Sequence, residues 1–238
     1  MDTLPVYVSI VFILTTFATV GFLIHAVRTV GTDKLASRIL IFVLPLWIFF
    51  QAALALGGFY QFTQSVPPRL LIFGVLPALL LIIGYFLFFR IEFIDRLPLK
   101  TLTQLHVIRV PVELVLYWLF IGGLVPEVMT FEGRNIDILS GILAIVVFFA
   151  AFRGDNVNRP LLIAYNLLGL ALLANIVGTA VVSLPSPMQM MAFDQPNRAV
   201  LFFPYIWLPT IVVPIVFFAH LASLWKIFFS RESERLSG

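Results

Sequence analysis

The chain has 238 residues, of which 61% are hydrophobic and 11% charged, with a formal net charge of +3 and no cysteine. Soluble domains normally carry about 25% charged and about 45–50% apolar residues, so this composition is that of an integral membrane protein. It excludes a soluble globular protein, and the lack of cysteine excludes disulfides and thiolate metal sites. The small positive charge is expected to reflect orientation in a bilayer, and no nucleic-acid partner is expected.

Seven apolar segments are long enough, at about 20 residues each, to cross a bilayer. The fifth is the shortest and the least typical of a full span. A transmembrane β-barrel is excluded because its alternating segments of about ten residues are not found in the sequence. We predict an all-α, polytopic bundle of seven transmembrane helices that forms a single domain over residues 1–238. The predicted spans are Pro5–Arg28, Ile39–Phe62, Leu70–Ile91, Leu102–Pro126, Ile138–Phe152, Pro160–Leu184 and Val200–Phe228.

Lysine and arginine are distributed unequally between the two sides of these spans. Twelve fall on one side, when Arg109 is counted with the start of its helix, and only Arg69, Arg134 and Arg198 fall on the other. Positively charged loops remain in the cytoplasm, so the N-terminus is expected outside and the C-terminus inside. The first span is full length and its leading MDTLP is not basic, so it is expected to be a retained helix rather than a signal peptide.

Two segments on the outer side are similar and raise the question of an internal repeat. Pro67-x-Arg69 precedes the third span, Pro196-x-Arg198 precedes the seventh, and each is followed by a Leu-Pro pair. Spans one to three and five to seven would share an orientation, so a parallel 3+1+3 duplication is compatible with the topology. The alternative, which the unequal spacing favours, is that both segments use the same turn-forming residues independently.

The fourth span carries a polar stripe. His106, Arg109, Glu113 and Tyr117 recur at intervals of three and four, which places them within about 80° of one another on a helix. A carboxylate at mid-depth is costly in hydrocarbon, so Glu113 is expected to face the bundle interior, a cavity or a partner. Arg109, one turn away, is expected to supply a cation. The stripe is then either a polar clamp that fixes the helix or a site that carries a ligand or a proton.

Further polar residues extend the predicted site. Gln51 and Asn175 are expected at a depth similar to that of Glu113, and with the stripe they form the predicted ligand or proton site between helix four and helices two, six and seven. Charged residues of the outer loops are expected to form an entrance above it, where an arginine could hold an anionic group. Salt bridges that tie the loops together are the alternative. The predicted entrance consists of Arg69, Glu132, Arg134, Asp137 and Arg198.

Three histidines offer a possible cofactor site. His25, His106 and His220 fall in the cytoplasmic halves of spans one, four and seven, and a pair of them could ligate a b-type haem. No spacing signature joins them, so no cofactor is the favoured expectation. A retinal protein is excluded because the lysine of the last span, Lys226, lies at its cytoplasmic end. The sequence has no catalytic or metal-binding motif, which disfavours an enzyme.

Several strings of the chain are similar to those of a known group of proteins. They are LPVYVSIVFILTTFATV, VPPR, LHVIRVPVELVLYWLF, VPEVMTFEGRNIDILSG, AFDQPN and FFPYIWLPTIVVP. They resemble hypothetical seven-helix inner-membrane proteins of Bacteroidetes-type bacteria over nearly the whole chain. The resemblance implies a multi-pass protein of the bacterial inner membrane and no mechanism, because that group carries no assigned activity. The helix count and orientation are also similar to those of seven-helix sugar transporters, by analogy only.

These observations favour a small-solute or proton-coupled transporter in which Glu113 is the titrating group. The first alternative is a membrane sensor or ligand-binding protein without catalytic activity. The second is a haem-bearing membrane enzyme, or a hydrolytic one that uses Glu113 with His106. The lipid bilayer is the expected partner in each case, together with a small-molecule ligand.

Overall fold

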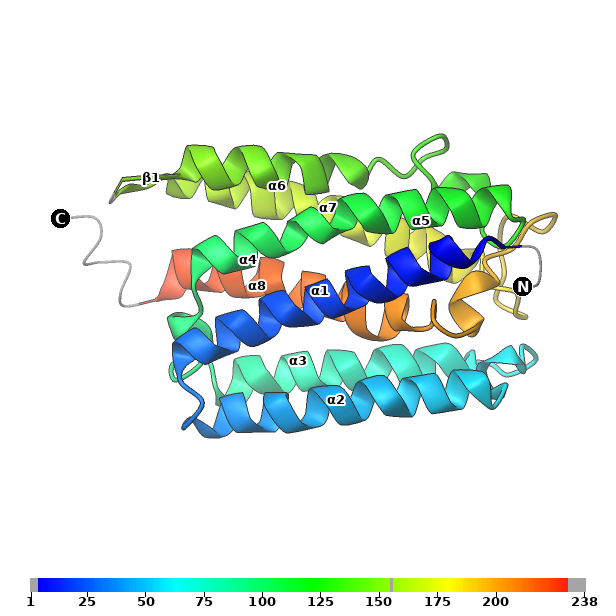
Figure 1. Ribbon diagram of the computed structural model, residues 1–238, viewed down its shortest axis with the longest axis horizontal. Helices are drawn as coiled ribbons and strands as arrows, with labels where there is room; N and C mark the ends of the chain where they lie inside the picture. The colour runs from blue at the N-terminus through cyan, green and yellow to red at the C-terminus, as the bar shows by residue number, and fades with distance from the viewer. Residues whose placement is uncertain (1–3, 155, 231–238) are drawn as a thin grey trace.

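The computed structural model describes residues 4–154 and 156–230, and this part of the chain is mainly helical (Figure 1). The predicted all-α class is confirmed. A two-stranded antiparallel hairpin joins α6 to α7. The elements are α1 (Val6–Val30), α2 (Leu35–Leu56), α3 (Leu76–Phe88), α4 (Leu99–Leu105), α5 (Arg109–Ile121), α6 (Ile138–Ala151), β1 (Phe152–Arg153), β2 (Asn156–Val157), α7 (Arg159–Val182) and α8 (Val213–Phe229).

The long helices lie side by side along the long axis of the molecule (Figure 1). α4 and α5 are joined by the short helix η4 (His106–Ile108) into one continuous column. Six helical segments within the described residues are long and apolar enough to cross a membrane. α6 is the exception, because its 14 residues extend about 21 Å, whereas a hydrocarbon core is about 30 Å thick. It covers only part of the length of the neighbouring α4–α5 column (Figure 1).

Several predicted spans end or begin at different residues in the structure, and the second and the seventh show the physical reason. The second was expected to reach Phe62, but α2 ends at Leu56, where Gly58 adopts a left-handed conformation with φ of 73°. Glycine tolerates this conformation without steric cost, and the chain turns there. The seventh was expected to begin at Val200, but its continuous helix begins at Leu208. Prolines 204 and 209 lack the N–H that an earlier helical turn would need.

The columns of α3 and α8 begin in the same way. A π-helical turn leads into each of them: η2 (Leu71–Val75) into α3 and η7 (Leu208–Val212) into α8. Pro67 lies four residues before η2, and Pro204 lies four residues before η7. The structural match therefore pairs Pro67 with Pro204, whereas the sequence similarity had paired Pro67 with Pro196.

Helix α2 supplies hydrogen-bond donors to both π-helical turns. The second residue of each following helix is a proline: Pro77 in α3 and Pro214 in α8. A proline cannot donate to the carbonyl four residues before it, which is that of Phe73 in one case and of Thr210 in the other. The Gln51 Nε2 donates to the Phe73 carbonyl at 3.0 Å, and the Trp47 Nε1 donates to the Thr210 carbonyl at 3.0 Å. Two side chains one turn apart on α2 thus compensate for both prolines.

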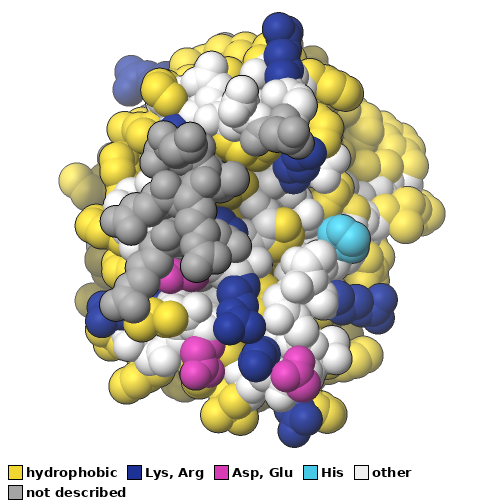
Figure 2. Space-filling view, turned by 90° about the vertical axis from the view of Figure 1, so that its left-hand side faces the viewer, with side chains coloured by type: hydrophobic (Ala, Val, Ile, Leu, Met, Phe, Trp, Pro, Cys, Tyr) yellow, Lys and Arg dark blue, Asp and Glu magenta, His cyan; other side chains and the backbone are white. Residues whose placement is uncertain are grey.

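The sides and ends of the bundle differ in chemistry. Large apolar side chains such as Phe42, Phe49, Leu87, Phe88 and Phe149 are exposed on its sides, as expected for surfaces that meet lipid. Lysine and arginine gather at the end where α1, α3 and α8 finish, which faces the viewer in Figure 2. The elements that meet at this end carry Lys34, Arg90, Arg96, Lys100, Arg153, Arg159 and Lys226.

Candidate functional site

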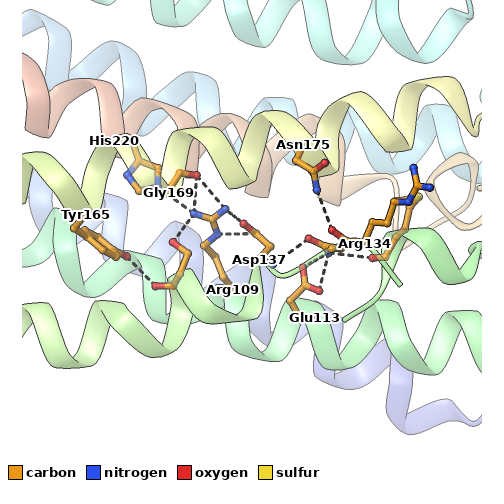
Figure 3. A network of polar contacts seen from close by, with 11 residues as sticks. Arg109, Glu113, Arg134, Asp137, Tyr165, Gly169, Asn175 and His220 are labelled. Carbon is orange, nitrogen blue, oxygen red and sulfur yellow. Dashed lines mark hydrogen bonds and ion pairs between the residues drawn. The ribbon is translucent and has the colours of Figure 1, made fainter. Parts of the chain in front are cut away.

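A buried ion pair lies at the centre of the bundle. Arg109, the first residue of α5, is only 2% exposed, and Asp137 directly precedes α6. The Arg109 Nε donates to Asp137 Oδ2 at 2.7 Å, and its Nη2 donates to Asp137 Oδ1, so the contact is bidentate (Figure 3). Asp137 was predicted to line an outer entrance. That prediction is wrong, because its side chain is turned inward to neutralise Arg109.

The remaining Arg109 donors are also engaged. Its Nη1 donates to Ser140 Oγ at 2.8 Å and to the Gly169 carbonyl at 3.2 Å, and it lies 3.1 Å from His220 Nε2. Its Nη2 reaches the Gly169 carbonyl as well, at 3.3 Å. A guanidinium has five N–H groups, and here each of them meets an acceptor. Arg109 therefore has no free donor for an added ligand.

The hydrogen bonds of His220 define its tautomer. Its Nδ1 lies 2.8 Å from Asn166 Oδ1, while Asn166 Nδ2 donates to the Leu162 carbonyl at 2.7 Å. The amide oxygen can only accept, so His220 Nδ1 carries the hydrogen and donates it. Its Nε2 is then the acceptor for Arg109. A neutral imidazole of one tautomer satisfies both partners.

His106 stacks on His220 and has different surroundings. The two ring centroids are 3.7 Å apart with an interplanar angle of 13°. The Tyr165 ring packs edge-on against His106, with the two centroids 5.8 Å apart. Both His106 nitrogens are buried, and neither has a hydrogen-bond partner among the described residues. His106 thus belongs to the buried polar cluster through its ring face alone.

The three histidines do not form a haem site. Axial ligation requires the ring nitrogens of two histidines to point at iron from opposite sides, whereas His106 and His220 present their ring faces to each other. Both nitrogens of His220 are already engaged. His25 is exposed on α1. The residues present do not fit the group.

Glu113 is 1% exposed and is held by an amide rather than by a cation. The Nδ2 of Asn135 lies 2.7 Å from each of its two carboxylate oxygens, and the same nitrogen lies 3.0 Å from the Met129 carbonyl. The Oδ1 of Asn135 accepts the Asp137 backbone N–H at 3.1 Å. Within the described residues Glu113 makes no ion pair. The expectation that Arg109 supplies a cation to Glu113 is wrong, because the Arg109 guanidinium is paired with Asp137 instead.

The short length of α6 brings these partners into the bundle. The chain leaves η5 (Glu127–Met129) without regular structure and reaches α6 only at Ile138. Asn135 and Asp137 lie on this irregular segment, and both are buried. Irregular backbone can lie deep in a membrane protein when other protein covers it. The segment lies where additional turns at the start of α6 would otherwise lie.

A cavity of about 110 Å³ opens beside the ion pair. Arg109, Glu113 and Asp137 line it, and most of its wall is aliphatic, from α5, α7, η2, η7 and the start of α8. Asn197 lines it as well, with its Nδ2 donating to the Ala180 carbonyl at 3.3 Å. The Oδ1 of Asn197 is buried and has no hydrogen-bond partner among the described residues. Apart from the paired Arg109 and Asp137, the cavity thus has two acceptor groups, the Glu113 carboxylate and the Asn197 Oδ1, in a wall that is otherwise mainly aliphatic.

Three residues of the predicted site lie elsewhere. Gln51 is buried but is engaged by η2 and by Tyr60, whose hydroxyl donates to its Oε1 at 2.6 Å. Asn175 was expected to be buried, but it is exposed and its Nδ2 donates to the Arg134 carbonyl at 3.2 Å. Tyr117 is half-buried, with its ring 4.9 Å from that of Phe131. None of the three is among the residues that line the cavity.

The predicted outer entrance is not assembled as expected. Arg69 donates to the Phe59 carbonyl at 3.2 Å, and its guanidinium lies over the rings of Phe59 and Phe62 at 4.7 and 4.2 Å. Asp137 is turned inward, as described above. Glu132, Arg134 and Arg198 are exposed.

Several residues of the site were not predicted. Asn135, Ser140, Gly169 and Asn197 all contact the cluster or line its cavity. An asparagine in a loop or a glycine in an apolar helix has no distinguishing sequence pattern. Asn166 differs from these, because an asparagine within an apolar span is recognisable from the sequence as a buried polar candidate.

Comparison with known proteins adds a family but no activity. A family model described as Domain of unknown function (DUF8737) matches residues 67–228, which is more than half of the chain. No curated protein and no solved structure matches the chain. The matched range includes Arg109, Glu113, Asn135, Asp137 and His220.

Proposed function

The chain belongs to this family, whose description assigns no activity, and we propose from its own geometry that it is a small-solute transporter in which Glu113 exchanges a proton. One observation carries the proposal. Glu113 is a buried carboxylate that lines a cavity, and the only cation of that cavity, among its described lining residues, is already paired with Asp137.

The pairing of Arg109 with Asp137 determines the charge balance around Glu113. Arg109 and Asp137 neutralise each other in a bidentate contact, so an ionised Glu113 leaves one uncompensated negative charge. Burying such a charge is costly unless the group takes up a proton or meets a cationic ligand. Binding at the cavity and protonation of Glu113 are therefore energetically linked. This linkage is what a proton-coupled transporter requires.

We further propose that the chain crosses the bacterial inner membrane seven times, with the N-terminus outside. The arrangement of α1 and α8 supports an odd number of crossings, because α1 begins at the end of the bundle opposite to that at which α8 finishes (Figure 1). The lysine and arginine residues at the latter end (Figure 2) support a cytoplasmic location for it. Setting Arg109 aside as buried does not change this imbalance.

The matched starts of α3 and α8 also support a parallel 3+1+3 arrangement. Each has a proline four residues before a π-helical turn and another as the second residue of the helix. In that arrangement the α4–α5 column, which carries Arg109 and Glu113, is the central element.

The transport proposal can be tested in proteoliposomes that contain a pH-sensitive dye. Small carboxylates and small alkylammonium ions are added outside, and the rate of luminal pH change is compared with that in protein-free liposomes. We expect at least one solute class to accelerate the change, and Glu113→Gln to remove the acceleration. Glu92→Gln is the matched control, because it alters an exposed carboxylate outside the predicted site and its entrance.

Two outcomes would overturn the proposal. One is a solute-dependent rate in Glu113→Gln that equals that of the original chain. The other is no rate above protein-free liposomes with either class of solute. If a solute binds the purified protein but no flux follows, the membrane sensor or ligand-binding alternative replaces transport.

A further inference from the structure

We infer that the cavity beside Glu113 selects a small aliphatic ammonium ion. This inference deepens the proposed function and rests on it for its biological meaning, but the binding itself can be tested separately. It follows from three properties of the cavity: the type of its polar groups, its net charge and its size.

The polar groups that the cavity can offer a ligand are acceptors. Each Glu113 oxygen receives one hydrogen bond, from Asn135, and a carboxylate oxygen can accept more than one. The Oδ1 of Asn197 accepts none from the described residues. A ligand that donates hydrogen bonds can therefore be accepted at either group.

The donors around the cavity are already used. The N–H groups of Arg109 are taken by Asp137, Ser140, Gly169 and His220. The Nδ2 of Asn197 donates to the Ala180 carbonyl. A carboxylate or phosphate ligand would find no available donor here, and it would add negative charge next to Glu113.

Charge favours a cation over a neutral donor. The Arg109–Asp137 pair is internally neutral, so an ammonium group beside Glu113 would complete a second pair in the same cavity. A buried charge is tolerated when it is paired and hydrogen-bonded. A neutral alcohol could donate to the same oxygens but would leave the charge of an ionised Glu113 uncompensated.

The remaining wall and the volume define the body of the ligand. Leu116, Leu173, Ile176, Val200 and Val212 are among the aliphatic residues of the lining. An apolar cavity of about 150 Å³ can bind benzene, so one of about 110 Å³ fits a compact molecule of about five heavy atoms. Isobutylammonium has this size and a branched aliphatic body.

The test is calorimetric titration of the purified full chain in detergent. Isobutylammonium is compared with isobutanol and with isovalerate at a pH where the amine is charged. We expect isobutylammonium to bind at least tenfold more tightly than isobutanol and isovalerate to show no binding. Glu113→Gln should weaken isobutylammonium binding at least tenfold, and Glu92→Gln, at an exposed carboxylate, should leave it unchanged.

A second variant tests the same inference if the Glu113→Gln protein does not fold. Val177→Phe places a larger side chain at the cavity wall without changing a polar group, and it should weaken isobutylammonium binding by a similar factor. Isovalerate binding more tightly than isobutylammonium would overturn the inference, as would unchanged affinity in both variants.

The outcomes separate this inference from the proposed function. Isobutylammonium binding without flux in proteoliposomes retains the ligand class and removes transport. Glu113-dependent flux of a carboxylate, with no isobutylammonium binding, retains transport and removes the ligand class.

Discussion

His106 and His220 stack ring on ring in the middle of the bundle, and their hydrogen bonding is opposite. The ring centroids are 3.7 Å apart. His220 is engaged at both nitrogens, by Arg109 and Asn166, whereas neither nitrogen of His106 has a partner among the described residues. One ring therefore contributes polar contacts and the other contributes packing, and this difference can be measured.

Phenylalanine at each position should give opposite results. His106→Phe keeps the stacked ring and removes two unsatisfied nitrogens, so we expect stability to be unchanged or increased. His220→Phe leaves Arg109 and Asn166 each without one partner, and should cost about 2–6 kcal/mol because each lost contact costs about 1–3 kcal/mol. Thermal unfolding in detergent checks both. A larger loss in His106→Phe than in His220→Phe would contradict the assignment.

Gly169 is predicted to tolerate no larger side chain. A Cβ at this position would overlap the His220 ring and approach Arg109 Nη1 to 3.3 Å. Gly169→Ala should therefore destabilise the protein by about 1–3 kcal/mol, as overpacking of a rigid core does.

Gly178 on the same helix is the matched control for this prediction, because a Cβ there meets nothing within 4 Å. Gly178→Ala should be neutral or stabilise the helix by up to about 1 kcal/mol. Both variants are compared by denaturation in mixed micelles. Equal effects of the two substitutions would show that His220 and Arg109 can move aside at little cost.

The Arg109–Asp137 pair should be costly to break on one side only. Arg109→Leu leaves a buried carboxylate without its cation, and such changes cost about 3–5 kcal/mol. The double variant Arg109→Leu/Asp137→Leu removes both charges and should recover part of that loss. Arg134→Leu, at an exposed position, should change stability by less than about 0.5 kcal/mol. The unfolding free energies of all three decide the matter, and a double variant less stable than Arg109→Leu would refute the interpretation.

The contact between Trp47 and Thr210 should depend on Pro214. Trp47→Phe removes the donor to the Thr210 carbonyl and should cost about 1–3 kcal/mol. Pro214→Ala restores a backbone N–H four residues after Thr210, so the same tryptophan substitution should cost less in that background. A double-mutant cycle of unfolding free energies measures the difference. Strict additivity would mean that Trp47 does not compensate for the proline.

Sequence reasoning predicted the helices better than their ends. Long apolar runs must form hydrogen-bonded helices in a bilayer, so the all-α class followed from hydropathy. The starts and ends depend on single residues, such as Gly58 after α2 and Pro204 before α8. Their effects compete with the preference of the flanking apolar residues for helix, and only the packed structure decides between them.

The candidate site was predicted on one helix and missed on its partners. His106, Arg109 and Glu113 are buried together, as their spacing of three and four indicated. Asn135 and Asp137 could not be found in this way, because they lie on an irregular segment whose path has no periodic pattern. Asn175 shows the converse error, because an amide in an apolar helix can face inward or outward.

The length of α6 determines how deeply Asn135 and Asp137 lie within the otherwise apolar bundle. One more helical turn at its start would add about 5.4 Å of cylinder and carry the carboxylate of Asp137 away from Arg109. Glu113 would lose the amide of Asn135 by the same displacement. An insertion or deletion near Ile138 would therefore change the depth in the bundle at which Asp137 and Asn135 lie. The partners of Arg109 and Glu113 could thus change in evolution without any substitution in α5.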